Sequence, residues 1–256
     1  MESESGEYLD GVSLVEVFNI VYLGDDQVPP EKQLGTISFV PPNRTDMQYL
    51  YKVDDVDLDK PSLKYGDPIM VTVGPQITEF CEFDFEFNLF CGAYTGIIEV
   101  EWEKLPYDGV ELWEERIDSD DGTGQICVQY GLFANAAVAN VELTLLGNCD
   151  STNVHGSVFA SNSRLDLPTR ASILFWVNSD NKVHVRDGMI PLSRSQVGVP
   201  LDSEFDLSIS LFCDSEECTT KVSLIPGEPD TFLQNFCEDK LQVRVTWELK
   251  KESITS

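Results

Sequence analysis

The side chains of this sequence that could do chemistry are mainly carboxylates, and they recur at every second position of apolar segments. One row of acids alternates with the apolar residues of 81–89, and a second row alternates with Ile98, Val100 and Trp102. A period of two is typical of a half-buried β-strand, so each row should project from one face of a sheet. Six carboxylates form our candidate acidic interaction face: Glu82, Asp84, Glu86, Glu99, Glu101 and Glu103.

If the two segments pair as a hairpin, these like charges lie opposite one another and destabilise the sheet. Three explanations remain open: basic residues on a third strand, a bound cation or basic partner, or strands that belong to different sheets. A pair of carboxylates could also act as general acid and base in a hydrolase. Because no feature of the sequence selects such a pair, we predict no catalytic residues.

Two further acidic clusters, at 54–59 and 118–121, have the donor type that calcium prefers. The first lacks the central glycine of a twelve-residue calcium loop, and the second lacks its distal glutamate. We therefore predict no metal site and no cofactor, and the carboxylates that come closest to one are Asp55, Asp57, Asp118, Asp120 and Asp121.

Cysteine and histidine do not form a metal or nucleophile motif. Cys213 and Cys218 are spaced C-x4-C, but the two histidines, His155 and His184, lie far upstream of them. The seven cysteines are odd in number and favour a reducing compartment, where they act as small apolar residues. No phosphate-binding loop, G-x-S-x-G elbow or H-E-x-x-H motif occurs, so we predict that the chain is not an enzyme.

The 256-residue chain has a net charge of −28, which makes some classes of binding partner unfavourable. It repels a phosphate backbone and an anionic membrane surface, which leaves a basic protein as the expected partner. Residues 1–121 carry 28 acids and 7 bases, so the acidic excess is concentrated in the first half. Hydrophobic residues make up 42% of the chain, which is typical of a folded protein rather than of a disordered acidic tail. The sequence does not set an oligomeric state.

Strand periodicity predicts an all-β fold, an antiparallel β-sandwich or barrel-like sandwich of many short strands with little helix. Residues 133–139 are expected to be loop or strand, with a single helical turn as the alternative, and 178–181 to be a hairpin loop. We expect one domain over 12–250 with a sub-boundary near 118–124, between mobile tails at 1–11 and 251–256. No signal peptide or transmembrane segment is expected, which predicts a cytoplasmic protein.

Several segments resemble, in order, a plant domain of unknown function that is frequent in grasses. That domain occurs alone and also C-terminal to the ribosome-inactivating domain of jasmonate-induced proteins. The similar segments are Val15–Phe18, Gly35–Phe39, Asp67–Pro75, Phe83–Phe87, Val138–Gly147, Gly156–Ser161, Asp187–Arg194 and Phe205–Leu211.

The resemblance implies a plant intracellular module that acts in stress or defence responses, and it supplies no catalytic residues. The toxin domain of the fused relatives needs a Glu-x-x-Arg sequence, and none of the seven arginines here has a glutamate three residues before it. Depurination of ribosomal RNA is therefore not expected from this chain. The sequence leaves three functions open: a non-enzymatic protein-interaction module first, then a translation- or ribosome-linked defence protein, or a calcium- or metal-dependent carboxylate hydrolase.

Overall fold

The computed structural model of the protein describes residues 11–25, 27–41, 47–55, 62–77, 83–100, 109–147, 152–164, 171–213, 216–236 and 239–248. The regular secondary structure of these residues is almost entirely β-strand. The first half holds β1 (Val12–Tyr22), β2 (Gly35–Val40), β3 (Gln48–Val53), β4 (Gln76–Ile77), β5 (Phe83–Leu89), β6 (Tyr94–Val100), β7 (Val110–Asp118) and β8 (Gln125–Leu146). The second half holds β9 (Asn153–Asn162), β10 (Ser172–Val177), β11 (Val183–His184), β12 (Gln196–Pro200), β13 (Phe205–Cys213), β14 (Glu216–Leu224), β15 (Asp230–Phe236) and β16 (Asp239–Glu248). Single 3-10 turns lie at Pro30–Lys32 (η1) and Ser179–Asn181 (η4).

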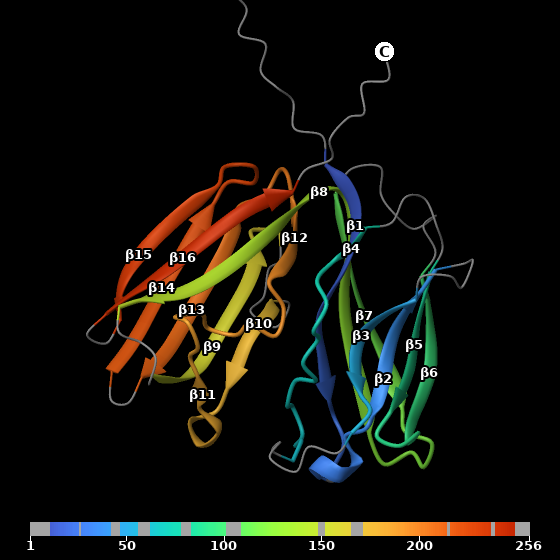
Figure 1. The fold of residues 1–256 in the computed structure, drawn as a ribbon. Coiled ribbons are helices and arrows are strands. Elements are labelled where there is room, and N and C mark those ends of the chain that lie inside the picture. Colours follow the sequence, from blue (N-terminus) through green and yellow to red (C-terminus); the bar gives the residue numbers. More distant parts are fainter. Residues whose placement is uncertain are drawn as a thin grey trace, which may run out of the picture.

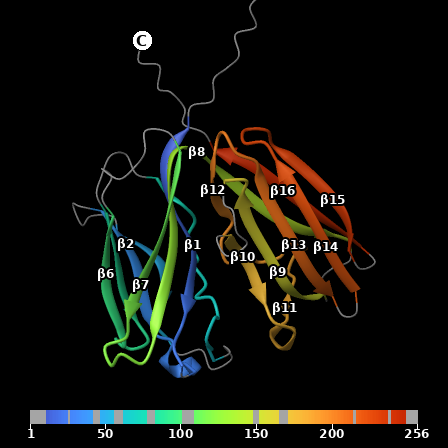
Figure 2. The same cartoon turned by 180° about the vertical axis from the view of Figure 1, so that it is seen from behind.

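The strands form two β-sandwiches that lie side by side (Figures 1 and 2). In the N-terminal sandwich, β7, β8 and β1 pack against the sheet β3-β2-β5-β6, and β4 pairs with the edge of β1. In the C-terminal sandwich, β15, β16, β8 and β12 pack against the sheet β10-β9-β13-β14. All strand pairs among the described residues are antiparallel, so the predicted all-β sandwich fold is confirmed.

Strand β8 belongs to both sandwiches and passes from one to the other (green in Figure 1). Its first half pairs with β1 and β7, and its second half pairs with β12 and β16. The change occurs at Ala136, which is the register partner of both Val12 in β1 and Pro200 in β12. Ala136, Ala137 and Ala139 are fully buried, because the strand is covered on both faces here and only small side chains fit.

Each sandwich has its own hydrophobic core, and a third, smaller cluster lies where the two meet. The alternation predicted for 81–89 is confirmed in β5, where the odd-numbered side chains are buried in the N-terminal core. The junction cluster contains Leu14, Phe18, Phe133, Ala136 and Val138. The two sandwiches therefore share a strand and a packed apolar contact.

The structure differs from the sequence-based expectations at the loop 178–181. This loop was predicted to close a hairpin between its flanking segments. Instead, β10 and β11 run in the same direction along one edge of β9, and the loop with η4 only interrupts that edge. Residues 133–139 are strand throughout, as part of β8, and residues 118–124 form the turn between β7 and β8. How the chain divides into domains stays a prediction. In the described residues, no helix is long and apolar enough to span a membrane.

A shared strand predicts that the two sandwiches unfold together. Phe133 in β8 is fully buried in the junction cluster, with its ring centroid 6.1 Å from that of Phe18. Phe133→Ala should cost about 3–5 kcal/mol of unfolding free energy, the range for a buried aromatic truncated to alanine. Hydrogen exchange followed by mass spectrometry should then show equal loss of protection in β5 and β13. Loss in one sandwich alone would contradict this expectation, and exposed Leu233→Ala serves as the neutral control.

Candidate interaction surface and the buried ion pair

The candidate acidic interaction face lies on the outer side of the sheet β3-β2-β5-β6. Asp84 in β5 is the direct register partner of Glu99 in β6, and Glu86 is opposite Ile97. The two strands are hydrogen-bonded neighbours, so the explanation that they belong to different sheets is wrong. Glu82, Glu101 and Glu103 lie outside the described residues.

A third strand of this sheet does carry a basic residue, but that residue does not lie beside the opposed carboxylates. Lys52 in β3 lies on the same sheet, opposite Thr36 of β2, which in turn is opposite Asn88 of β5. Its ammonium group is 3.0 Å from Asp54 and 5.0 Å from the ring centroid of Tyr49. The hydrogen bond and charge of Asp54 raise the pKa of Lys52. Lys52 therefore has a partner already, two register rows away from the Asp84–Glu99 pair.

The acidic face also carries exposed apolar side chains. Ile97 is 57% exposed and Tyr49 is 42% exposed. Tyr49, Ser38, Glu86 and Ile97 are successive register partners across the four strands, so they form one row. The face thus combines carboxylates with two apolar groups that water solvates poorly.

The carboxylates nearest to a calcium site do not converge. Asp55 is exposed, and Asp57 lies outside the described residues. Asp118 accepts a hydrogen bond from Gln125 at 2.7 Å, while Asp120 accepts one from Thr95 at 3.4 Å. In the described ranges no group of three histidine, cysteine, aspartate or glutamate side chains could hold a metal ion.

Asp121 instead holds the β7–β8 turn together. Its carboxylate accepts the Ser119 hydroxyl at 2.8 Å, the Thr123 amide at 3.0 Å and the Thr123 hydroxyl at 2.7 Å. These donors, Thr123 foremost, lower the pKa of Asp121 to about 2. A charge-assisted set of this kind fixes the turn that leads into β8.

Acid should therefore weaken the fold through Asp121. The pKa of Asp121 in the folded protein lies below that of a free aspartate. The ionised carboxylate therefore stabilises the fold at pH values above the pKa of free aspartate, and this stabilisation is lost as the pH falls toward 2. Asp121→Asn should remove this part of the pH dependence, measured as urea unfolding free energy between pH 5 and 2. An unchanged acid limb in the variant would contradict the assignment.

The histidines and described cysteines take structural positions. His184 is exposed in β11. His155 stacks on Phe212, with ring centroids 5.2 Å apart. Cys127, Cys213 and Cys218 are buried free thiols, and Cys91 is an exposed one. Burial raises the pKa of Cys127 to about 11, which keeps it a thiol.

The main polar constellation of the structure, missed by sequence reasoning, is a buried ion pair between the two sandwiches. The Glu16 side chain of β1 is fully buried, and the Arg194 side chain, just before β12, is 1% exposed; their Oε1 and Nη2 atoms are 3.3 Å apart. Arg194 also donates to the backbone oxygens of Val17 at 2.8 Å and Phe18 at 3.4 Å. Arg194 thus binds three consecutive residues of β1.

Glu16 in turn receives donors from two strands of the C-terminal sandwich. The hydroxyl of Ser172 in β10 donates to Oε1, and the amide of Gly198 in β12 donates to Oε2. A Cβ at Gly198 would lie 2.8 Å from Glu16 Oε2, so glycine lets the amide approach the carboxylate. Burial raises the pKa of Glu16, and the charge of Arg194 and these two hydrogen bonds lower it in part.

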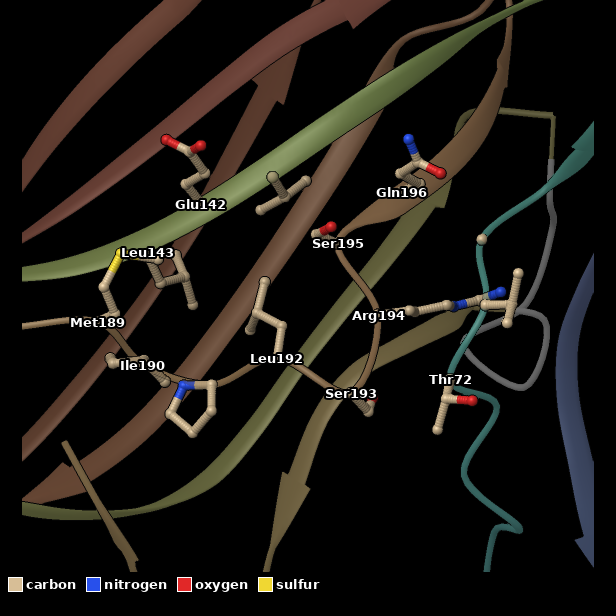
Figure 3. A pocket seen from close by; sticks show the side chains of 14 residues that line it. Thr72, Glu142, Leu143, Met189, Ile190, Leu192, Ser193, Arg194, Ser195 and Gln196 are labelled. Atoms are coloured by element: carbon tan, nitrogen blue, oxygen red, sulfur yellow. The ribbon is translucent and has the colours of Figure 1, made fainter. Parts of the chain in front are cut away.

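The segment before β12 arches off β8, and this arch delivers Arg194 to β1. The backbone amide of Ile190 donates to the oxygen of Leu143, and the amide of Val141 donates to the oxygen of Ser195. Between these two bonds, residues 191–194 have no register partner in β8. The amide and hydroxyl of Ser193 bond the backbone oxygen of Leu174 in β10 at 2.8 and 2.9 Å. Arg194 is the next residue, and Figure 3 shows its side chain directed away from Met189 and toward β1.

A cleft of 650 Å³ lies beneath this arch, between the two sandwiches. Its walls come from the segment before β4, from β8 and from the arch itself (Figure 3). The lining residues are Thr72–Gly74, Val141–Leu143 and Met189–Gln196.

The ion pair could be recognised in the sequence only as an anomaly. Glu16 is a single acid within an apolar run, and Arg194 ends a Pro-Leu-Ser-Arg segment, but 177 residues separate Arg194 from Val17, which it contacts. Both residues lie in segments that carry the family resemblance. Strand periodicity says nothing about which of the many acids meets which base.

Removal of Arg194 should leave a buried carboxylate without its counterion. Arg194→Met should cost about 3–5 kcal/mol at pH 8, the range for one broken partner of a buried pair. The cost should shrink at pH 5, because protonation relieves a glutamate whose pKa is already raised by burial. The measurement is the difference in urea unfolding free energy from the wild type at each pH.

The control is the double variant Glu16→Gln with Arg194→Met, which should be more stable than Arg194→Met alone at pH 8. Equal costs at both pH values, or a double variant less stable than the single one, would show that the pair does not act as a unit.

Comparison with known proteins gives one family match. The family model described as Domain of unknown function (DUF6598) matches residues 35–245. A search of curated proteins found no match. A solved multidomain structure of Extended-Synaptotagmin 2 aligns with 97% of this chain and 59% of its own, at 8% identity and a TM-score of 0.30. Human GIVD cytosolic phospholipase A2 aligns with 93% of this chain and 33% of its own, at 9% identity and a TM-score of 0.26. The chain spans less than two thirds of either structure, and at these TM-scores neither likeness supports an argument.

Proposed function

The chain belongs to the DUF6598 family of domains of unknown function, and we propose that it is a non-enzymatic protein-interaction module. The observation that carries the proposal is the direct opposition of Asp84 and Glu99 on an outer sheet face. Like charges in register partners destabilise a sheet. A partner that brings positive charge to this face would relieve that repulsion, and the relief would favour binding.

The sheet itself supplies little compensation for this pair. Strands β2, β5 and β6 contain no lysine or arginine, and Lys52 of β3 is bound to Asp54. Within the described strands of this sheet, no free basic side chain offsets the cost of the opposed carboxylates. A lysine- or arginine-bearing partner would be drawn to the face by the field and would form charge-assisted hydrogen bonds on contact.

The exposed apolar groups give such a partner something to bury. Ile97 lies in the register row next to Glu99, on the same face, and Tyr49 lies in the same row as Ile97 on the far edge of the sheet. Interfaces commonly place apolar or aromatic anchors inside a polar rim. On this account the carboxylates set the rate and the choice of partner, while Ile97 and Tyr49 supply affinity.

The organism, the cellular compartment and the process are proposed from the sequence resemblance. We place the module inside plant cells, in the cytoplasm, where it would act in stress or defence responses through a basic protein partner. No membrane partner and no nucleic acid is expected, since the charge of −28 opposes both.

Neutralisation of the Asp84–Glu99 pair should have opposite effects on stability and on partner binding. Asp84→Asn with Glu99→Gln should raise the unfolding free energy by roughly 0.2–1 kcal/mol, because the cross-strand repulsion is removed. The same variant should lose the basic proteins that the wild type retains in a pull-down from plant extract. Urea unfolding and quantitative mass spectrometry are the two measurements.

The matched control is Glu204→Gln with Glu228→Gln, which makes the same change in net charge at exposed sites of the C-terminal sandwich. It should retain the captured proteins. Equal losses in both variants would mean that overall charge, and not this face, recruits them, and the proposal would be overturned.

A further inference from the structure

A second outer face, that of the sheet β10-β9-β13-β14, differs from the rest of the protein in its chemistry. The inner side of this sheet is the C-terminal core, to which β9 contributes Val154, Val158 and Ala160. The odd-numbered side chains of β9 and the even-numbered side chains of β13 therefore point outward. In a chain of net charge −28, the described residues at the centre of this face carry no charged side chain.

A row of small hydroxyl side chains crosses the middle of the face and ends at a tryptophan. Trp176 of β10 is opposite Ser157 of β9, which is opposite Ser210 of β13, which is opposite Thr219 of β14. We call these four residues the hydroxyl row. It crosses three inter-strand spacings, about 14 Å, which is the length of a short oligosaccharide rather than of a single sugar.

Aromatic side chains flank the hydroxyl row on both sides. On one side, His155 and Phe212 are register partners and their rings stack, with an interplanar angle of 22°. On the other side, Phe159 contacts the ring of Trp176 at 5.7 Å and 64°. Trp176 is 43% exposed, so a large aromatic surface is open to solvent, and Phe159 packs against its ring.

Two hydroxyls of the row, those of Ser157 and Ser210, are available, and the lysine at its margin is paired with an aspartate. The hydroxyls of Ser157 and Ser210 make no hydrogen bond to any residue that the structure describes. Lys221, one row away, is 3.0 Å from Asp206. Glu217, beside Phe212, accepts the Thr219 hydroxyl at 2.8 Å. The face therefore offers two free hydroxyls and an aromatic ring, with no charged side chain in the row itself.

We propose that the hydroxyl row binds a neutral carbohydrate chain. The apolar C–H face of a sugar ring packs on an aromatic side chain, and its hydroxyls both donate and accept hydrogen bonds, as serine hydroxyls do. Because the row carries no charged side chain, it neither attracts nor repels an uncharged polymer. The row also runs straight across the sheet, as an extended chain would. This site is separate from the acidic interaction face, which lies on the other sandwich.

Other partners that stack on aromatic rings fit this face less well. A nucleic acid would bring phosphates to a protein of charge −28, with Lys221 already paired. An apolar protein surface would bury the free hydroxyls of Ser157 and Ser210 without partners, which costs free energy. A carbohydrate satisfies both the rings and the hydroxyls.

The test is affinity electrophoresis of the full chain in native gels that contain hydroxyethyl cellulose, xylan, galactomannan or starch. At least one of these neutral polymers should retard the protein, and polygalacturonate should not. Trp176→Ala should lower the affinity about tenfold or more, as loss of an aromatic anchor does. Ser210→Val should weaken it several-fold, since valine suits a strand but cannot hydrogen-bond.

Two variants separate binding from folding. Trp176→Phe keeps an aromatic face and should retain part of the affinity, while Leu233→Ala removes an apolar group that is 56% exposed on β15 and should change nothing. The proposal is overturned if none of the four neutral polymers retards the wild type, if only polygalacturonate or single-stranded DNA does, or if Trp176→Ala binds as the wild type does.

Discussion

The buried ion pair between Glu16 and Arg194 fixes how the two sandwiches sit against each other. Two charges removed from water are stable only when they attract each other closely and further hydrogen bonds surround them, and here those hydrogen bonds come from both sandwiches. Ser172 and Gly198 bind the carboxylate from one side, and the backbone of β1 binds the guanidinium from the other. Any sliding of one sandwich against the other would break these bonds together.

A fixed arrangement has a consequence for function, because it presents two outer faces of opposite chemistry from one rigid body. The acidic face of the N-terminal sandwich opposes Asp84 to Glu99 and exposes Ile97. The hydroxyl row of the C-terminal sandwich is uncharged and ends at Trp176. A protein that holds a basic partner on one sandwich and a neutral polymer on the other would join the two at a set distance.

Much of the fold could be predicted from the sequence, because strand alternation is a local signal. The odd-numbered side chains of β5 are buried as their period predicted, and Asp84 and Glu86 lie on the outer face. The shared strand β8 could not be predicted, since its central alanines break the alternation where both faces are covered. The ion pair and the hydroxyl row were also missed, because each is assembled from strands far apart in the chain and depends on register, which no local pattern sets.

Residual dipolar couplings of backbone amides in solution test whether the ion pair and β8 hold the two sandwiches as one body. One alignment tensor should fit the amides of β5 and β6 together with those of β9 and β13, using the orientations of the present structure. Two tensors of different magnitude or direction would show that the sandwiches move independently, and the account would be wrong.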